Sequence, residues 1–470
     1  MSSQSLSESE TESPPLFNYL KQEIPLEDLK DYASPRRITS IDFLKGFAIC
    51  FVILAHTAQA WLAPDSIYLF GILLSLLDIL GPSLFVFLSA LSVIFSIKRK
   101  EGIVHPKIIR NRIFTRGLVM IIIGMFTNIL VIQDGVVTVA IYGWNIITFI
   151  GFAQIFSFYI IKLRKSRRIL IGILIIFLSP ALRAILYIGK SDGNIILSFF
   201  HYIITSPTPH LTLLPWVSIC FMSTIFGEYI YDAMNKGTKD AYIGLFRIFF
   251  VWGIIFVLFG IFSYYPNGLN FTDWQPGWYL QTPSSMEEIG GLLEYPHLKL
   301  LITANKQDFF VFPGMPSFLI RGTSANLFYN QGMALIIISI FFYYIDIKEN
   351  SNNFTKTLIY YGKTSLSLFL IQFLFIPLFF KQYNIAIFFI VSLSYVGFLG
   401  IFMYIWMEYA NGVGSPEWLM VQFGRIGQKS GEAVKKTTKK VYNRLKKERV
   451  KKMEDFMKKL SKDDIKEDNS

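Results

Sequence analysis

The sequence predicts an all-α protein, a polytopic transmembrane helix bundle of about ten spans. Of its 470 residues, 53% are hydrophobic and only 17% are charged. Apolar runs of about 18 residues or more recur between residues 41 and 410, which is long enough for a helix to cross a bilayer. The two cysteines, Cys50 and Cys220, both lie in apolar runs and match neither a disulfide framework nor a metal site.

The expected spans follow one another from the first apolar run to the last. They lie at residues 42–62, 67–97, 113–133, 143–162, 169–188, 211–231, 243–264, 326–345, 358–380 and 384–408. The second is the longest, and we expect it to be tilted or to extend past the bilayer. A short extra helix is expected from Ile195 to Ile204, which leaves the number of spans open by one or two.

Lysine and arginine residues give the expected orientation. The loops after the second and fourth spans are rich in both, whereas the loops at residues 63–66 and 134–142 hold neither. Because cytoplasmic loops carry an excess of these residues, both termini are expected in the cytoplasm. The sequence therefore predicts a multi-pass protein of the cell membrane, with His56 towards the outer face.

The two ends of the chain differ in charge. Residues 1–35 are acidic and rich in Ser and Glu, which is typical of a disordered tail, and residues 36–420 form the transmembrane domain. Residues 421–470 form a tail rich in Lys. Such a tail could bind nucleic acid, but beside a membrane exit we expect it to bind anionic lipid headgroups instead.

A long segment at residues 265–325 separates the seventh and eighth spans, on the expected outer side. It holds aromatic and polar residues, namely Trp274, Trp278, Tyr279, His297 and Arg321, together with several prolines. Loops of this length are often functional, and these side chains suit a sugar or a lipid headgroup. An interfacial cap anchored by its tryptophans would explain the same residues.

His56 lies deep in the first span. It is roughly 21 Å along the helix axis from Ile41, at about 1.5 Å per residue, in a bilayer core about 30 Å thick. An ionisable side chain at this depth is costly and often functional. A histidine that only packs between helices, or that lies at the outer interface, is the alternative interpretation.

Asp78 lies in the second span, about 20 residues before Lys98, which places it at a depth similar to that of His56. A carboxylate beside an imidazole orients the ring, and such a pair can take a proton from a hydroxyl or an amine. We therefore expect His56 to act as a general base with Asp78 as its partner. An aspartate at the membrane boundary, or one that caps a break before Gly81-Pro82, would be structural.

Other polar residues inside the spans could line a cavity or form hydrogen bonds between helices; they are Asn128, Gln154, Asn326, Asn330, Gln331 and Gln372. The sequence holds no glycine-rich phosphate loop, no His-Glu-x-x-His and no Gly-x-Ser-x-Gly. A pump driven by nucleotide hydrolysis is therefore not expected, nor is a bound metal.

Short motifs occur in a distinctive order along the chain. They are Arg37-x-x-Ser40-Ile41-Asp42-x-x-Lys45-Gly46 followed by His56, Asp78-x-x-x-Pro82-x-x-Phe85-x-Phe87, Arg116-Gly117, Leu214-Pro215-Trp216, Tyr361-Gly362-x-x-Ser365-Leu366 and Gly414-Ser415-Pro416-Glu417-Trp418-Leu419. In this order they resemble the integral-membrane acyltransferase superfamily, especially the heparan-alpha-glucosaminide N-acetyltransferase-like proteins and related prokaryotic membrane proteins.

The resemblance implies that an acyl group, acetyl in particular, moves from cytoplasmic acyl-CoA to a sugar or glycolipid acceptor at the outer face. It implies catalytic roles for His56 and Asp78. The nucleotide end of acyl-CoA would bind to basic residues at the inner side, for which the candidates are Arg37, Lys45, Arg112 and Arg116. Positive-inside topology alone would also place these residues there.

The chain departs from the family pattern at several positions. Lys45 stands where the family has arginine, and Phe149-Ile150-Gly151 lacks the family's arginine. The short loop after the first span holds no histidine, although the animal enzymes carry their active histidine there. The acceptor is therefore open. A proton-coupled transporter or flippase in which His56 and Asp78 relay protons stays an alternative, as does a non-catalytic scaffold. The oligomeric state is open, and a homo-oligomer is one candidate.

Overall fold

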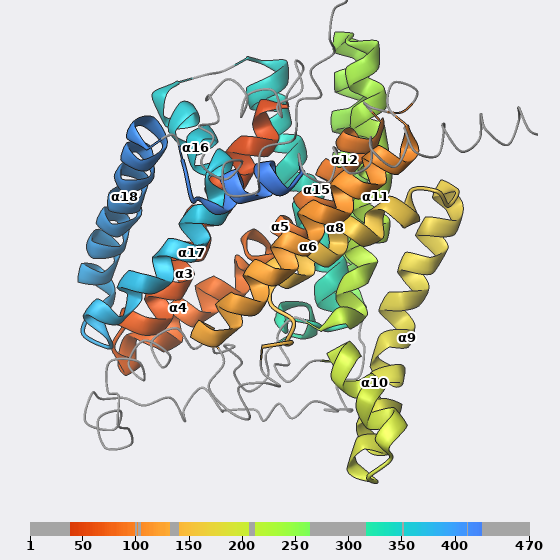
Figure 1. Cartoon of the computed structure of the whole chain (residues 1–470), viewed down its shortest axis with the longest axis horizontal. Coiled ribbons are helices and arrows are strands. Elements are labelled where there is room, and N and C mark those ends of the chain that lie inside the picture. Colours follow the sequence, from red (N-terminus) through yellow and green to blue (C-terminus); the bar gives the residue numbers. More distant parts are fainter. Residues whose placement is uncertain are drawn as a thin grey trace, which may run out of the picture.

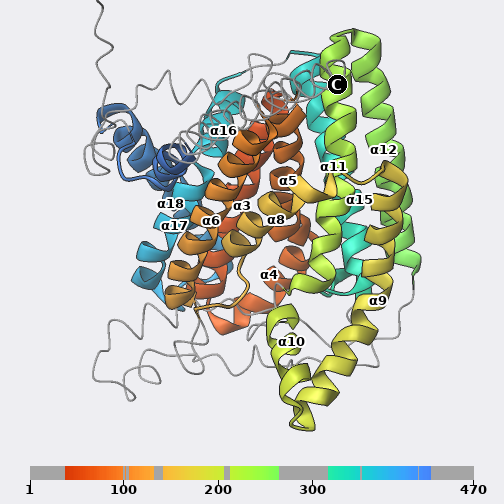
Figure 2. The same ribbon diagram turned by 45° about the vertical axis from the view of Figure 1, so that its right-hand side comes forward.

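The computed structural model describes residues 38–98, 101, 105–131, 141–205, 212–263, 316–349, 352–410 and 412–424. Apart from an isolated bridge between Leu62 and Tyr383, these residues hold no β-structure. The predicted all-α class is confirmed, and most of the long helices lie side by side in one bundle (Figures 1 and 2). The predicted tails apart from residues 421–424, Arg37, and the 265–325 segment up to residue 315 lie outside the described residues.

Every predicted span coincides with one helix or with a series of consecutive helices. The helices that the structure describes are given next. In chain order these are α3 (Thr39–Trp61), α4 (Pro64–Leu76), η1 (Asp78–Leu80), α5 (Pro82–Lys98), α6 (Pro106–Val131), α8 (Ile146–Ile160), α9 (Lys165–Ser191), α10 (Ile195–Thr205), α11 (Leu213–Lys236), α12 (Lys239–Phe262), η3 (Ser317–Leu319), α15 (Ser324–Phe342), η4 (Tyr343–Ile347), α16 (Asn353–Lys363), α17 (Ser365–Phe375), η5 (Ile376–Phe379) and α18 (Ile385–Tyr409). The predicted extra helix at Ile195 is confirmed as α10, which extends past the end of the bundle (Figure 2).

Six of the described helices are long and apolar enough to cross a membrane by themselves. They are α3, α9, α11, α12, α15 with η4, and α18, and the bent pair of α16 and α17 makes a seventh if it counts as one span. The helices α5, α6 and α8 occupy three further predicted spans. The structure is thus consistent with the expected total of about ten.

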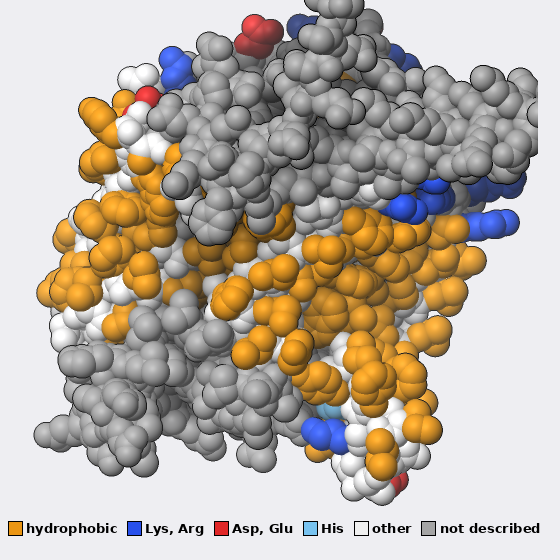
Figure 3. Space-filling model, in the orientation of Figure 1, with side chains coloured by type: hydrophobic (Ala, Val, Ile, Leu, Met, Phe, Trp, Pro, Cys, Tyr) orange, Lys and Arg blue, Asp and Glu red, His pale blue; other side chains and the backbone are white. Residues whose placement is uncertain are grey.

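The bundle has inner and outer helices. In α11, 83% of the most apolar 18-residue window is buried, compared with 22% in α12 and 28% in both α9 and α18. The outer helices expose Leu, Ile and Phe side chains, and hydrophobic side chains cover much of the described surface (Figure 3). Such a surface suits contact with lipid tails. Among the described residues, the inner helix α15 carries five of the buried Asn, Gln and Ser side chains, namely Ser324, Asn326, Asn330, Gln331 and Ser339.

The second predicted span is not one long helix, contrary to the expectation from its length. It consists of α4, the short 3-10 turn η1 and α5, which begins at Pro82. Proline lacks a backbone N–H group and fits the first turn of a helix but not its interior, so a new helix begins there. The break places Asp78 in η1, which packs against α3 and α15.

The first span crosses α16 at two glycines. A Cβ atom on Gly46 would lie 1.8 Å from the carbonyl oxygen of Leu358, and one on Gly362 would lie 1.8 Å from that of Asp42. Only glycine permits two helix backbones to approach this closely. The crossing therefore joins the Lys45-Gly46 motif to the Tyr361-Gly362 motif, far apart in the sequence.

The ninth predicted span is bent. The helix α16 and the segment formed by α17 and η5 meet at 82°. The carboxylate of Glu417 accepts hydrogen bonds from the backbone N–H groups of Leu366 and Ser367, both at 3.0 Å, and from the Ser367 hydroxyl. The first amides of a helix have no partner within it, so Glu417 completes the start of α17 after the bend.

Candidate active site

His56 lies in the last two turns of α3 and is partly exposed as a residue. The imidazole packs against two phenylalanines of α17, with ring centroids 5.9 Å from Phe369 and 5.3 Å from Phe373. The side chain of Gln372, on the same helix, interacts with the imidazole. The Nδ1 atom of His56 is buried and has no hydrogen-bond partner within the described part of the chain.

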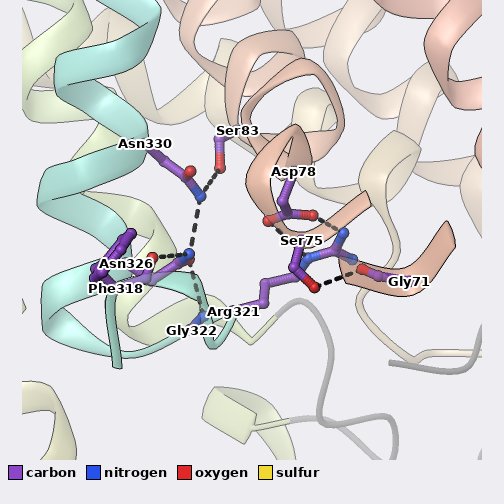
Figure 4. A network of polar contacts seen from close by, with 9 residues as sticks. All are labelled: Gly71, Ser75, Asp78, Ser83, Phe318, Arg321, Gly322, Asn326 and Asn330. Atoms are coloured by element: carbon purple, nitrogen blue, oxygen red, sulfur yellow. Dashed lines mark hydrogen bonds and ion pairs between the residues drawn. The ribbon is translucent and has the colours of Figure 1, made fainter. Parts of the chain in front are cut away.

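The carboxylate of Asp78 is bound at both oxygens by Arg321 (Figure 4). The Nε atom of Arg321 donates to Asp78 Oδ2 at 3.1 Å, and Nη2 donates to Oδ1. Only 8% of the Asp78 side chain and 23% of the Arg321 side chain are exposed. A guanidinium group that binds both oxygens of a carboxylate fixes the geometry as well as the charge. The pair ties η1 to the turn between η3 and α15.

The structure does not pair His56 with Asp78. Within the described residues, no hydrogen bond or ion pair joins the two side chains, because both Asp78 oxygens are occupied by Arg321. A guanidinium is a permanent cation with several donors, so it binds a carboxylate in preference to a neutral imidazole. The expected orienting partner is thus corrected: Asp78 orients Arg321, whose charge acts on the His56 imidazole.

Two asparagines of α15 hold the turn that carries Arg321 (Figure 4). The Nδ2 group of Asn330 donates to Ser83 Oγ of α5 and to Asn326 Oδ1, both at 3.1 Å. The Nδ2 group of Asn326 donates to the carbonyl oxygen of Phe318 at 2.9 Å. These bonds confirm that both asparagines form hydrogen bonds between segments, and they connect α15, η3 and α5 behind the ion pair.

Several buried polar atoms on the inner helices lack a partner among the described residues. They are His56 Nδ1, Gln372 Oε1, Asn330 Oδ1, both amide atoms of Gln331 and Trp216 Nε1. Buried polar groups in proteins are nearly always hydrogen-bonded, so unpaired ones call for a specific explanation. A bound ligand and ordered water are two such explanations.

The basic candidates lie at the opposite end of α3 from His56. Lys45, roughly 16 Å before His56 along the axis at about 1.5 Å per residue, donates through Nζ to Ser92 Oγ of α5 at 3.4 Å. Arg112 and Arg116 are one turn apart on α6, so they share a helix face, and both are partly exposed. The structure thus brings three of the four candidates to one end of the bundle.

The part of the chain that contains His56 and Asp78 matches a known protein family. The family model described as heparan-alpha-glucosaminide N-acetyltransferase, catalytic, matches residues 37–259. The chain is similar to this family over this range, which is slightly less than half of its length. The match supports a membrane acetyltransferase-type function for the chain. Comparisons with curated proteins and with solved structures give no match.

The N-acetyltransferase family region contains His56 and Asp78 but not their partners. Arg321 and Gln372 lie beyond its C-terminal limit at residue 259, yet one binds Asp78 and the other interacts with His56. The candidate site is therefore built from the family region and from the helices that follow it. No local pattern marks Arg321 as the partner of Asp78, although it is the only arginine between Arg247 and Arg425.

Proposed function

We propose that the protein is a membrane acyltransferase that moves an acyl group, acetyl in particular, from cytoplasmic acyl-CoA to a sugar or glycolipid at the outer face. The observation that carries this proposal is the arrangement along α3. A partly exposed histidine lies near one end, and basic residues gather at the other. The turn η1, which holds Asp78 in its ion pair with Arg321, packs against the same helix. The family match to an N-acetyltransferase catalytic domain supports the same conclusion.

The reaction that we assign to this site is acyl transfer with a general base. His56 takes the proton from a hydroxyl or amine of the acceptor, and the acceptor oxygen or nitrogen attacks the carbonyl carbon of the thioester. The carbon–sulfur bond then breaks, and the imidazolium returns the proton to the thiolate of coenzyme A. Arg321, held by Asp78, stabilises the negative charge that develops on the carbonyl oxygen.

The opposite end of the bundle would bind the donor. Lys45, Arg112 and Arg116, with Arg37 ahead of them, would attract the phosphates of acyl-CoA through their positive charge. This assignment places both termini in the cytoplasm and His56 towards the outer side of the cell membrane. The 265–325 segment would then lie on the acceptor side, and the basic tail at residues 421–470 would contact anionic lipid headgroups.

The test is turnover of radiolabelled acetyl-CoA by the purified protein in detergent, measured as hydrolysis and as transfer to sugar acceptors. His56→Gln is expected to lower kcat by about 10²- to 10⁴-fold, the usual contribution of a general base, while acetyl-CoA still binds. His105→Gln is the matched control, because this histidine is exposed ahead of α6. A folded wild-type protein that neither binds nor turns over acetyl-CoA would overturn the proposal and favour the transporter.

A further inference from the structure

One face of α17 forms the wall against which the His56 ring packs. Phe369, Gln372 and Phe373 follow the spacing of residues that share a helix face, and both phenylalanine rings contact the imidazole. Gln372 is completely buried between them. Its backbone carbonyl oxygen accepts a hydrogen bond from the Tyr395 hydroxyl of α18 at 2.8 Å, which fixes its position from the other side.

The orientation of the Gln372 amide follows from its hydrogen bonds. The Nε2 group donates to the carbonyl oxygen of Phe369 at 3.0 Å, so Oε1 is the end of the amide that is left over. Oε1 is buried without a hydrogen-bond partner among the described residues, and the same holds for His56 Nδ1. Gln372 Oε1 can only accept a hydrogen bond, whereas His56 Nδ1 can donate one when it carries a proton.

We infer that Gln372 is a positioning residue for His56: its Oε1 accepts a hydrogen bond from His56 Nδ1–H. A neutral imidazole carries one ring proton, and the partner of one nitrogen decides which nitrogen holds it. An amide oxygen offers no proton, so the ring proton resides on Nδ1. The Nε2 atom then keeps the lone pair that a general base needs. This role in catalysis rests on the proposed function, whereas the hydrogen bond itself does not.

The choice of an amide has a chemical consequence. A carboxylate beside Nδ1 would favour the charged imidazolium, whereas a neutral carbonyl oxygen selects the tautomer without adding a charge. Arg321 is the cation whose charge acts on this ring, and Asp78 neutralises it. The arrangement therefore leaves the Nε2 lone pair of His56 available to accept a proton.

The direct test is the tautomer of His56, read by NMR of protein labelled with ¹⁵N-histidine. Protonated and unprotonated ring nitrogens have well-separated ¹⁵N shifts, and His56→Gln identifies the signals among the five histidines. We expect the Nδ1–H tautomer in the wild type and loss of this preference in Gln372→Met, which keeps the length of the side chain but not the acceptor. A wild-type His56 that carries its proton on Nε2 would overturn the inference, even if Gln372→Met fails to fold.

Kinetics then test the role in turnover. Gln372→Met is expected to lower kcat by about 10- to 100-fold, less than the loss of the base itself, with KM for acetyl-CoA unchanged within about twofold. Gln372→Glu keeps an acceptor for Nδ1–H but adds a charge that favours the imidazolium, so it should restore part of kcat only at higher pH. Gln154→Met on α8 is the control and should leave kcat unchanged.

The two measurements separate the inference from the proposed function. A tautomer that changes in Gln372→Met, in a protein without any turnover, supports the hydrogen bond and contradicts the transferase. Turnover that needs His56, with a tautomer and a kcat that do not respond to Gln372→Met, supports the transferase and overturns the role of Gln372.

Discussion

Asp78 and Arg321 form a two-point ion pair although 243 positions separate them in the chain. The pair joins a break in one span to the start of another, because Asp78 lies in η1 and Arg321 precedes α15. It also connects the N-acetyltransferase family region to the part of the chain beyond residue 259. This part of the candidate site therefore depends on a contact that neither part of the chain could make alone.

The first prediction concerns the stability that this pair provides. Arg321→Gln leaves the Asp78 carboxylate buried without its cation, and we expect a loss of about 3 kcal/mol in the free energy of unfolding. The double variant Asp78→Asn with Arg321→Gln should recover part of this loss, because no buried charge remains. Chemical denaturation in detergent micelles measures both changes.

A more exposed ion pair provides the comparison. Lys165, whose side chain is 40% exposed, pairs with Glu228 at 3.5 Å. Removing a partly exposed charge of this kind usually costs about 1 kcal/mol or less, so Lys165→Gln should be close to wild type. Equal stability losses for Arg321→Gln and Lys165→Gln would contradict a special role for the buried pair.

The positions of the spans were predictable, because an apolar run of sufficient length has few alternatives to a membrane helix. The place of Asp78 within the second predicted span was predictable as well. Its partner was not, since a pairing between helices leaves no local pattern in the chain. Arg321 does carry one signal, as the only arginine between Arg247 and Arg425, but nothing in that signal selects Asp78 over other carboxylates.

The bend between α16 and α17 shows a second limit of sequence reasoning. The residues around Thr364 include no proline, and the apolar run continues from Leu358 to Phe380. The bend coincides with two distant contacts, the crossing of Gly362 with α3 and the bonds from Glu417 to the start of α17. A local pattern could not reveal it, because both contacts come from segments elsewhere in the chain.

The second prediction tests the glycine crossing of α3 and α16. In Gly46→Ala the new methyl group would lie 1.8 Å from the carbonyl oxygen of Leu358, a backbone atom that cannot rotate away. The helices must then separate, and we expect a loss of about 3 kcal/mol or more in the free energy of unfolding. Thermal unfolding in detergent, followed by circular dichroism, measures the change.

Gly397→Ala is the matched control for that substitution. A Cβ atom on Gly397, within α18, would have no neighbour within 4 Å. Alanine favours a helix over glycine by about 1 kcal/mol, so this variant should be as stable as the wild type or slightly more so. The crossing would lose its assigned role if both alanine variants unfolded at the wild-type temperature.

The third prediction concerns Glu417, which lies after the last membrane helix. Burial raises the pKa of this carboxyl above its ordinary value, although hydrogen bonds from Ser367 and Leu366 act in the opposite direction. A pKa that is higher in the folded state means that the protonated form favours folding. This stabilisation is complete below the unfolded pKa and is lost as the pH rises through the folded one.

Glu417→Gln removes the titration of this carboxyl group and should reveal whether its protonated form or its charged form favours folding. The difference in Tm between the variant and the wild type should shift in favour of the variant as the pH rises from about 4 to about 8, because only the wild type gains a buried charge. Other titrating groups are common to both proteins and cancel in the difference. A difference in Tm that does not change with pH would show that Glu417 keeps one charge state across this range.

The last prediction concerns the donor end of the bundle. Arg112 and Arg116 share a face of α6 near Lys45, so each should contribute a charge-assisted contact to the phosphates of acyl-CoA. Arg112→Gln and Arg116→Gln are each expected to weaken acetyl-CoA binding by about 10-fold, as titration calorimetry in detergent would measure. Because partly exposed charges are screened, the effect should shrink at high salt.

Arg167→Gln changes an exposed arginine of α9. It is the control for net charge and should change the affinity for acetyl-CoA far less. If all three variants weaken binding equally, the attraction depends on overall charge, and the α6 arginines do not form a specific site.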